Sequence, residues 1–190
     1  MSEKTLTEQE RKSLLWLARE TIYAAASHKP LPILPDEQVT DAMKQPGAVF
    51  VTLTIGGELR GCIGSLQAYQ PLIQDVQAHA IDAAFNDYRF GPVSLAEVPL
   101  LEIEISRLTP SEPLPYKSPE QLPKILKPNV DGVVLRDGYR SATFLPQVWE
   151  QLPDPEDFLS HLCQKMGAPA NLWRQKVLDV SIYHVEEFHE

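Results

Sequence analysis

The chain has 190 residues, 43% of them hydrophobic and 23% charged, which is the composition of an ordinary globular protein of one or two domains. Its formal net charge of -9 argues against a broad nucleic-acid-binding surface, because such a surface neutralises phosphates with lysine and arginine. No apolar run approaches the roughly 18 residues of a membrane span and the first residues lack the apolar core of a signal peptide, so we expect a cytoplasmic protein.

The first predicted element is a helix over residues 8–26. Thr7 and Glu10 have the spacing of a capping box, and apolar residues follow at helical intervals. Residues 31–45 form an irregular connection in which one short helix is expected over residues 36–44.

The strongest predicted strand covers residues 48–55, which are rich in β-branched and aromatic side chains. The pair Gly56-Gly57 then predicts a hairpin, with residues 58–63 as the returning strand. Pro71 suits the first turn of a helix that ends near Phe85.

The second half of the chain continues to alternate strands with helices. Residues 101–106 alternate apolar and polar side chains, which predicts a strand with one buried face and one face carrying Glu102 and Glu104. The remaining predicted elements are a hairpin with an Asp-Gly turn, two helices and a strand, over residues 132–144, 146–151, 156–166 and 177–185. This order indicates an α+β fold with a mainly antiparallel sheet flanked by helices.

The most unusual stretch is Arg60-Gly61-Cys62-Ile63-Gly64, on the returning strand of the first hairpin. Glycine weakens the interior of a strand, so two glycines here indicate positive φ, a bulge or a close backbone approach. The thiol of Cys62 is either a reactive group or a small buried hydrophobe. The second thiol, Cys163, lies on the apolar side of a predicted helix and is expected in the core.

Arg60 offers a second pair of alternatives. Its guanidinium is suited to a carboxylate or phosphate ligand, or it forms an internal ion pair with Glu102, Glu104 or Asp87. Asp87 and Arg89 lie on a predicted loop, where binding residues are common, although a local salt bridge is the simpler interpretation.

Asp75, His79 and Asp82 lie one turn apart on the third predicted helix. Such spacing can present metal ligands, but no second histidine or cysteine completes a known pattern. We therefore expect a solvated helix face and no metal site.

The motif Leu59–Leu66 and its context resemble the AMMECR domain family, whose bacterial and archaeal members are called AmmeMemoRadiSam system protein A. The further matching stretches are residues 50–53, 83–90, 101–106, 131–132, 143–150, 158–167 and Trp173. The sequence departs from the family at Tyr88, where many members have proline, and at Met166, where many have alanine. The resemblance covers nearly the whole chain as a single domain.

The resemblance implies a larger lobe and a smaller lobe, the latter expected around residues 110–150. It supplies no established reaction and leaves the cofactor unknown. The family name reflects genomic association with a Memo-like protein and a radical-SAM enzyme, so both are expected partners. An older proposal for the family places it near transcription, replication, repair or translation.

These observations support two main hypotheses. In the first, the chain is an accessory or ligand-binding protein that holds a small anionic molecule or a partner's tail. The candidate binding residues are Arg60, Gly61, Gly64, Asp87, Arg89 and Glu104. In the second, it is an enzyme with a nucleophilic Cys62 thiolate, in which Arg60 stabilises an anion. A nucleic-acid-associated role is a weaker third hypothesis.

Overall fold

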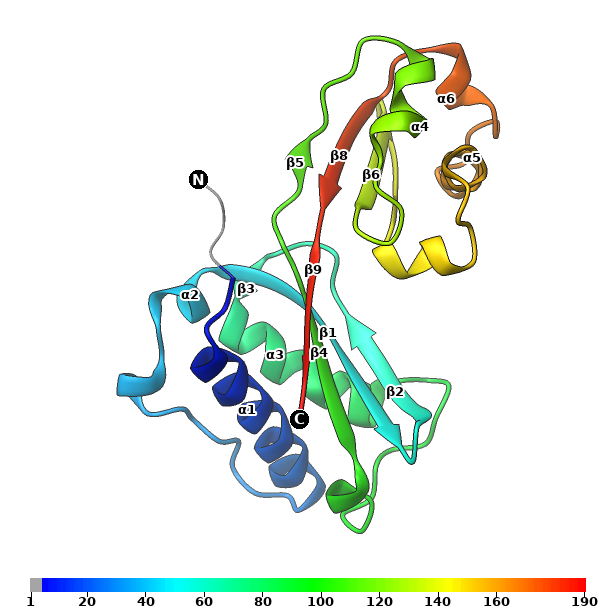
Figure 1. Cartoon of the computed structure of the whole chain (residues 1–190). Coiled ribbons are helices and arrows are strands. Elements are labelled where there is room, and N and C mark those ends of the chain that lie inside the picture. The colour runs from blue at the N-terminus through cyan, green and yellow to red at the C-terminus, as the bar shows by residue number, and fades with distance from the viewer. Residues whose placement is uncertain (1–4) are drawn as a thin grey trace. The chain divides into compact units, whose positions relative to one another are not determined.

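The computed structural model describes residues 5–190 (Figure 1). The chain divides into two compact units. Unit 1 contains the residues up to Thr109 together with Glu186–Glu190, and unit 2 contains Pro110–Val185. The resemblance implies a smaller lobe around residues 110–150. Unit 2 begins at the same place and extends to Val185, and its core includes residues of the later helices and a later strand.

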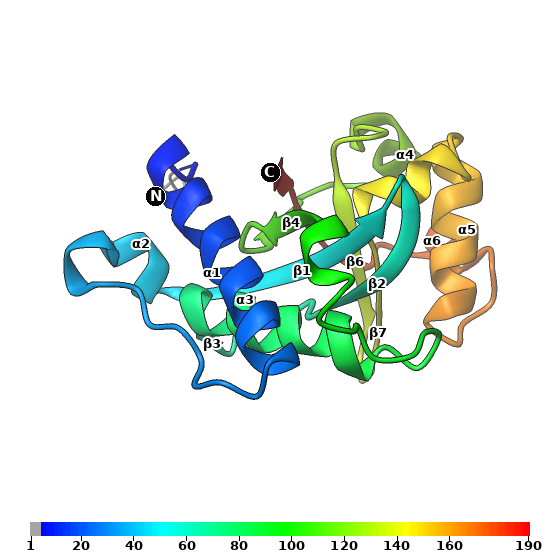
Figure 2. The ribbon, with the colours of Figure 1, turned by 90° about the horizontal axis from the view of Figure 1, so that it is seen from below.

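Unit 1 is built on one sheet with the strand order β2-β1-β4-β9, and β3 pairs with the beginning of β1. Two long helices, α1 (Glu8–Ala26) and α3 (Leu72–Ile81), lie on the same face of this sheet (Figures 1 and 2). The strands are β1 (Pro46–Ile55), β2 (Glu58–Gly64), β3 (Gln70–Pro71), β4 (Glu102–Leu108) and β9 (Val185–His189).

The core of unit 1 lies between the sheet and these helices. Alternate residues of β1 and β4, such as Val51 and Ile105, face the helices and are fully buried. Leu14 and Ile22 from α1 and Val76 from α3 pack against them. The opposite side of the sheet, here called the polar face, carries the alternate residues Thr52, Thr54, Cys62, Glu102 and Glu104.

Unit 2 contains a four-stranded sheet with the order β5-β8-β6-β7. Its strands are β5 (Glu112–Pro113), β6 (Gly132–Asp137), β7 (Arg140–Phe144) and β8 (Asp179–Tyr183), and its helices are α4 (Leu122–Ile125), α5 (Pro155–Lys165) and α6 (Leu172–Gln175). Trp149 stacks on Phe158 in its core, with ring centroids 3.7 Å apart. Cys163 is fully buried there, as predicted.

Local signals in the sequence locate most elements. The capping box of Thr7 and Glu10 is present, and Gly167 ends α5 with a φ of 76°. The predicted helix over residues 36–44 is instead two pieces, a 3-10 turn (Asp36–Gln38) and α2 (Asp41–Lys44). The predicted strand over residues 177–185 is present as β8, whereas β9, which begins at Val185 and pairs within unit 1, has no counterpart among the predicted elements.

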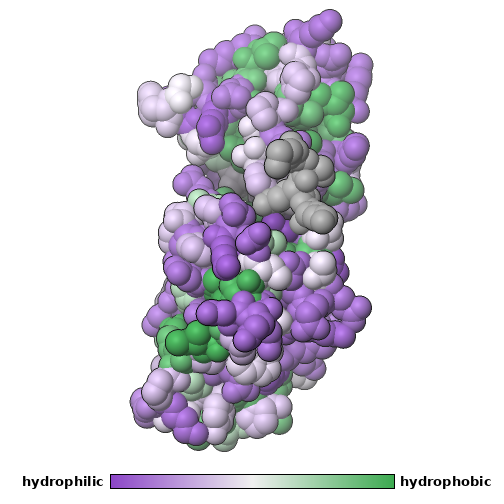
Figure 3. Space-filling model, turned by 90° about the vertical axis from the view of Figure 1, so that its left-hand side faces the viewer, coloured by the Kyte–Doolittle hydropathy of each residue, from purple (hydrophilic) through white to green (hydrophobic). Residues whose placement is uncertain are grey.

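Within residues 5–190, no helix combines the length and apolar character needed to cross a membrane. On the face shown in Figure 3, hydrophilic residues predominate and hydrophobic residues form small separate patches.

Candidate functional site

The strand that carries the Arg-Gly-Cys motif contains a β-bulge. Leu53 of β1 pairs with Gly61 of β2, whereas the next residue, Thr54, pairs with Leu59. Arg60 is therefore the extra residue of β2, and the irregularity indicated by the glycines is present.

The two glycines of the motif allow parts of the chain itself to approach closely. A Cβ atom on Gly61 would overlap the carbonyl oxygen of Ala83, which follows α3 in a π-helical turn (Asp82–Asn86). A Cβ atom on Gly64 would overlap the carbonyl oxygen of Val49 and the ring of Phe50. The space that these glycines create is thus filled from within unit 1.

Cys62 lies on the polar face and is partly exposed, so it is not a core residue. The hydroxyl of Thr52, directly opposite on β1, donates to its sulfur over 3.3 Å. Its backbone points to the outer edge of β2, where the N–H donates to Asp87 Oδ2 at 2.9 Å and the carbonyl accepts from Arg89 Nη2 at 3.2 Å. Two side chains thus occupy the place of a neighbouring strand.

Asp87 and Arg89 are joined by a two-pronged ion pair. Nε and Nη2 of Arg89 donate to the two carboxylate oxygens of Asp87 over 2.9 and 2.6 Å. The hydrogen bonds from Arg89 hold the pKa of the buried Asp87 carboxyl well below its usual range, against the opposing effect of burial. The simpler interpretation of this loop, a local salt bridge, is present, and its carboxylate also supports Cys62.

Arg60 has an internal partner, but not one of the three suggested by the sequence. Its Nε donates to Glu97 Oε1 at 2.9 Å, and its Nη1 and Nη2 donate to the carbonyls of Gly91 and Pro92 at 2.9 and 3.2 Å. Hydrogen bonds from Arg60 and then from Ser94 lower the pKa of Glu97 to about 2. The Ser94-x-x-Glu97 spacing is a turn signal that could have drawn attention to this carboxylate.

Glu104 shares a row of the polar face with Cys62. It pairs with Thr52 across β1 and β4, and Thr52 pairs with Cys62 across β1 and β2. Burial, followed by the negative charge of Glu187, raises the pKa of Glu104. We call Cys62, Thr52 and Glu104 the polar row.

The prediction of a solvated face for Asp75 and His79 is wrong, because both side chains are buried. Asp75 accepts hydrogen bonds from the Val49 N–H at 2.9 Å and from Gln70 Nε2 at 2.8 Å, which joins α3 to β1 and β3. These contacts make Asp75 a structural residue. Among residues 5–190, no group of three or more histidine, cysteine or acidic side chains is arranged to hold a metal ion.

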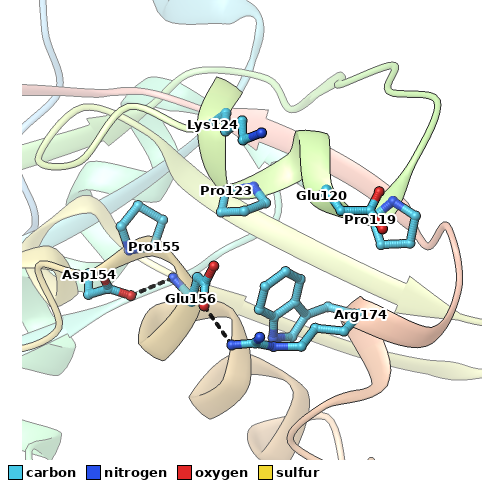
Figure 4. A pocket seen from close by; sticks show the side chains of 9 residues that line it. Pro119, Glu120, Pro123, Lys124, Asp154, Pro155, Glu156 and Arg174 are labelled. Atoms are coloured by element: carbon cyan, nitrogen blue, oxygen red, sulfur yellow. Dashed lines mark hydrogen bonds and ion pairs between the residues drawn. The ribbon is translucent and has the colours of Figure 1, made fainter.

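Unit 2 contains a pocket of about 570 Å³ that sequence reasoning did not identify (Figure 4). Three proline rings, Pro119, Pro123 and Pro155, line it. Arg174 lies at its base, 4.6 Å from the ring centroid of Trp173, and pairs with Glu156 at 2.6 Å. Glu120, Lys124 and Asp154 also line the pocket, so that it carries charged groups of both signs.

Comparisons with known proteins identify the family and the fold of the chain. A profile of the AMMECR1 family matches residues 15–188. The chain is 36% identical to a protein of Methanothermobacter thermautotrophicus, over 97% of this chain and 96% of that protein. It is 32% identical to a protein of Methanocaldococcus jannaschii, over 98% and 93% of the two chains. Its fold matches the crystal structure of an uncharacterised protein of Pyrococcus horikoshii with a TM-score of 0.79 and 32% identity, over 97% and 93% of the two chains.

Proposed function

Because this chain belongs to the AMMECR1 family, we propose that it is an accessory, ligand-binding component that acts with a Memo-like protein and a radical-SAM enzyme. The choice of partners rests on the resemblance of the Leu59–Leu66 motif to the AmmeMemoRadiSam proteins, and a cytoplasmic location is part of the proposal. The binding surface in this proposal is the polar face of unit 1, with Cys62 as its functional group.

One observation carries the choice of surface. Cys62 is partly exposed and is held by three side chains, Thr52 at its sulfur and Asp87 and Arg89 at its backbone. A buried structural cysteine needs no such support, whereas a group that must meet a ligand in one orientation does.

The two arginines of the site are better placed to hold the Cys62 motif than to bind an anion. All three nitrogen positions of the Arg60 guanidinium already donate to Glu97, Gly91 and Pro92, and Arg89 is held by Asp87. An anionic ligand would have to displace these internal acceptors. We therefore assign Arg60, Asp87 and Arg89 to positioning the motif.

The test is a binding measurement with a Memo-like protein. We expect the unmodified chain to bind it in isothermal titration, and Cys62→Ala to weaken binding at least tenfold. Tyr139→Ala, which removes a fully exposed ring from unit 2, serves as the matched control. Absence of binding to both the Memo-like protein and the radical-SAM enzyme would contradict the proposal.

A second candidate function, a cysteine-dependent enzyme, is favoured by the Thr52 hydroxyl beside the sulfur of Cys62. A hydrogen bond to sulfur stabilises the thiolate, which is the nucleophilic form. If this candidate is correct, Cys62→Ser abolishes function in cells while the protein keeps its fold and its partners. Full function of Cys62→Ser would exclude it.

A further inference from the structure

One row of the polar face brings a thiol, a hydroxyl and a carboxyl together from three neighbouring strands. Cys62 on β2 faces Thr52 on β1, and Thr52 faces Glu104 on β4. Directly opposite residues in antiparallel strands have Cβ atoms about 5 Å apart. The carboxyl of Glu104 is therefore within reach of the Thr52 hydroxyl, on the side away from Cys62.

A fourth strand extends the row with an imidazole. The N–H of Glu190 donates to the carbonyl of Ile103 at 3.3 Å, and near the other end of the pair Glu186 contacts Arg107. These two contacts fix β9 antiparallel to β4 in a register that puts His189 opposite Glu104. The electrostatic influence of His189 on Glu104 agrees with this register.

We propose that Glu104 is the proton acceptor for the thiol of Cys62, with the hydroxyl of Thr52 as the relay between them and His189 as the flanking charge. This inference rests on the proposed function in one respect, namely that Cys62 is the functional group of the polar face.

Thr52 has the chemistry that a relay needs. A hydroxyl carries one donor and two acceptor positions, so it can receive a proton from sulfur and release its own proton to a carboxylate. Thr52 Oγ1 and Cys62 Sγ lie 3.3 Å apart, with the hydroxyl donating to the sulfur. In the relay the hydroxyl rotates, so that Oγ1 accepts the thiol proton and its own proton is donated to Glu104.

Glu104 is distinguished from the other carboxylates near Cys62 by what surrounds it. Asp87 and Glu97 are each held by an arginine, which lowers their pKa values and makes them poor proton acceptors. No described residue donates a hydrogen bond to the Glu104 carboxyl, and its pKa is raised. Glu104 is therefore the best placed of these carboxylates to take up a proton.

The titratable groups around Glu104 come from three strands. Glu102 lies two residues away on β4, Cys62 lies across Thr52 on β2, and Glu187 and His189 lie on β9. Glu187 raises the pKa of Glu104 and His189 lowers it. The charges of two β9 residues therefore influence the pKa of Glu104.

The proposed reaction transfers an acyl group from an acyl donor to the sulfur of Cys62. As the sulfur of Cys62 attacks the acyl carbon, an S–C bond forms and the bond to the leaving group breaks. The thiol proton moves to Thr52 Oγ1, and the hydroxyl proton of Thr52 moves to Glu104. The products are a thioester on Cys62, the departed leaving-group anion and a neutral Glu104.

The test uses p-nitrophenyl acetate as the acyl donor and the full chain with Cys163→Ser, so that Cys62 is the remaining thiol. We expect a burst of p-nitrophenol whose rate, plotted against pH, shows a shoulder that follows the titration of Glu104. In Glu104→Gln and Thr52→Val the shoulder is lost and the burst rate at pH 6 falls about tenfold or more, since a positioned base contributes roughly 10²–10⁴-fold. Thr52→Ser restores it, and His189→Gln moves it to higher pH.

Two controls separate proton transfer from a general effect of charge. Glu58→Gln removes an exposed carboxylate at the start of β2, outside the polar face, and should leave the burst unchanged. Alkylation by iodoacetamide reports the thiolate population alone, so in Glu104→Gln it should be unchanged or faster while the ester burst is slower. A slower alkylation in proportion to the burst, or no shoulder in the parent protein, would overturn the proposal.

These results are independent of the partner-binding test. If Cys62→Ala still binds the Memo-like protein, the proposed binding surface is wrong, but the burst experiment still reports on Glu104. If binding depends on Cys62 but the pH profile of the burst has no shoulder, the proposed binding surface is supported and the proton relay is rejected.

Discussion

The backbone N–H of Cys62 donates a hydrogen bond of 2.9 Å to the carboxylate of Asp87, a residue that lies 25 positions later in the chain and is almost completely buried. The same carboxylate is held by Arg89, which donates to the carbonyl of Cys62. Both backbone polar groups of one edge-strand residue are thus satisfied by a pair of side chains. This arrangement fixes the orientation of the Cys62 side chain without a further strand.

We predict that Asp87→Ala destabilises unit 1 by about 2 kcal/mol, because it leaves the Cys62 N–H without its acceptor. Asp87→Asn, which keeps an acceptor oxygen, should lose less. Since the folded-state pKa of Asp87 is lowered, the stability that it contributes is present above about pH 4 and is lost as the pH falls towards its folded pKa. Urea unfolding at pH 7 and pH 3 measures both effects. A change below 0.5 kcal/mol in Asp87→Ala, a value typical of unimportant surface positions, would contradict this account.

The glycines of the motif predict a second stability effect. Gly61→Ala places a methyl group onto the carbonyl oxygen of Ala83, so the π-helical turn must move away from β2. We expect a loss of about 3 kcal/mol, at the upper end of overpacking effects. Gly91→Ala is the matched control, because nothing lies within 4 Å of its added Cβ. The melting temperature of Gly61→Ala should be clearly lower than that of Gly91→Ala. Equal melting temperatures would show that the π-helical turn moves away from β2 at no cost in stability.

The sequence predicts features that depend on neighbouring residues better than features that depend on distant ones. The capping box of Thr7 and Glu10 and the hairpin at Gly56-Gly57 are local patterns, and both predictions are confirmed. The partner of Arg60 could not be chosen in this way. Glu97 lies 37 residues away, on a loop whose path depends on the whole sheet.

Burial of polar residues is the other feature that periodicity fails to predict. Asp75 and His79 have the spacing of a solvated helix face, yet they point into unit 1. Asp75 is satisfied there by backbone and side-chain donors from β1 and β3, which no pattern within the helix reveals. Such a buried carboxylate can be recognised only from a three-dimensional structure, which shows its hydrogen-bond donors.

The buried histidine predicts a pH dependence of stability. Burial lowers the pKa of His79, but the carboxylates of Asp75, with Nδ1 and Oδ2 3.2 Å apart, and of Asp82 together raise it by more, so the net shift is upward. The stabilisation is therefore fully present below about pH 6.5 and is lost as the pH rises through the higher folded pKa. The difference in unfolding free energy between the parent protein and His79→Gln should shrink from pH 6 to pH 9. His161→Gln, at an exposed position, should show no such trend, and a difference that is constant with pH would exclude a charged His79.

The two thiols should differ sharply in reactivity in the folded protein. Cys163 is fully buried in unit 2, and burial raises the pKa of its thiol, which reduces both access and the thiolate population. Cys62 is partly exposed on the polar face and has the Thr52 hydroxyl at its sulfur. We predict that a thiol-specific disulfide reagent modifies one thiol in the folded protein and both in denaturant, with Cys62→Ala abolishing the fast reaction. If both thiols react only after unfolding, Cys62 is enclosed in solution, and the binding surface must be sought elsewhere on unit 1.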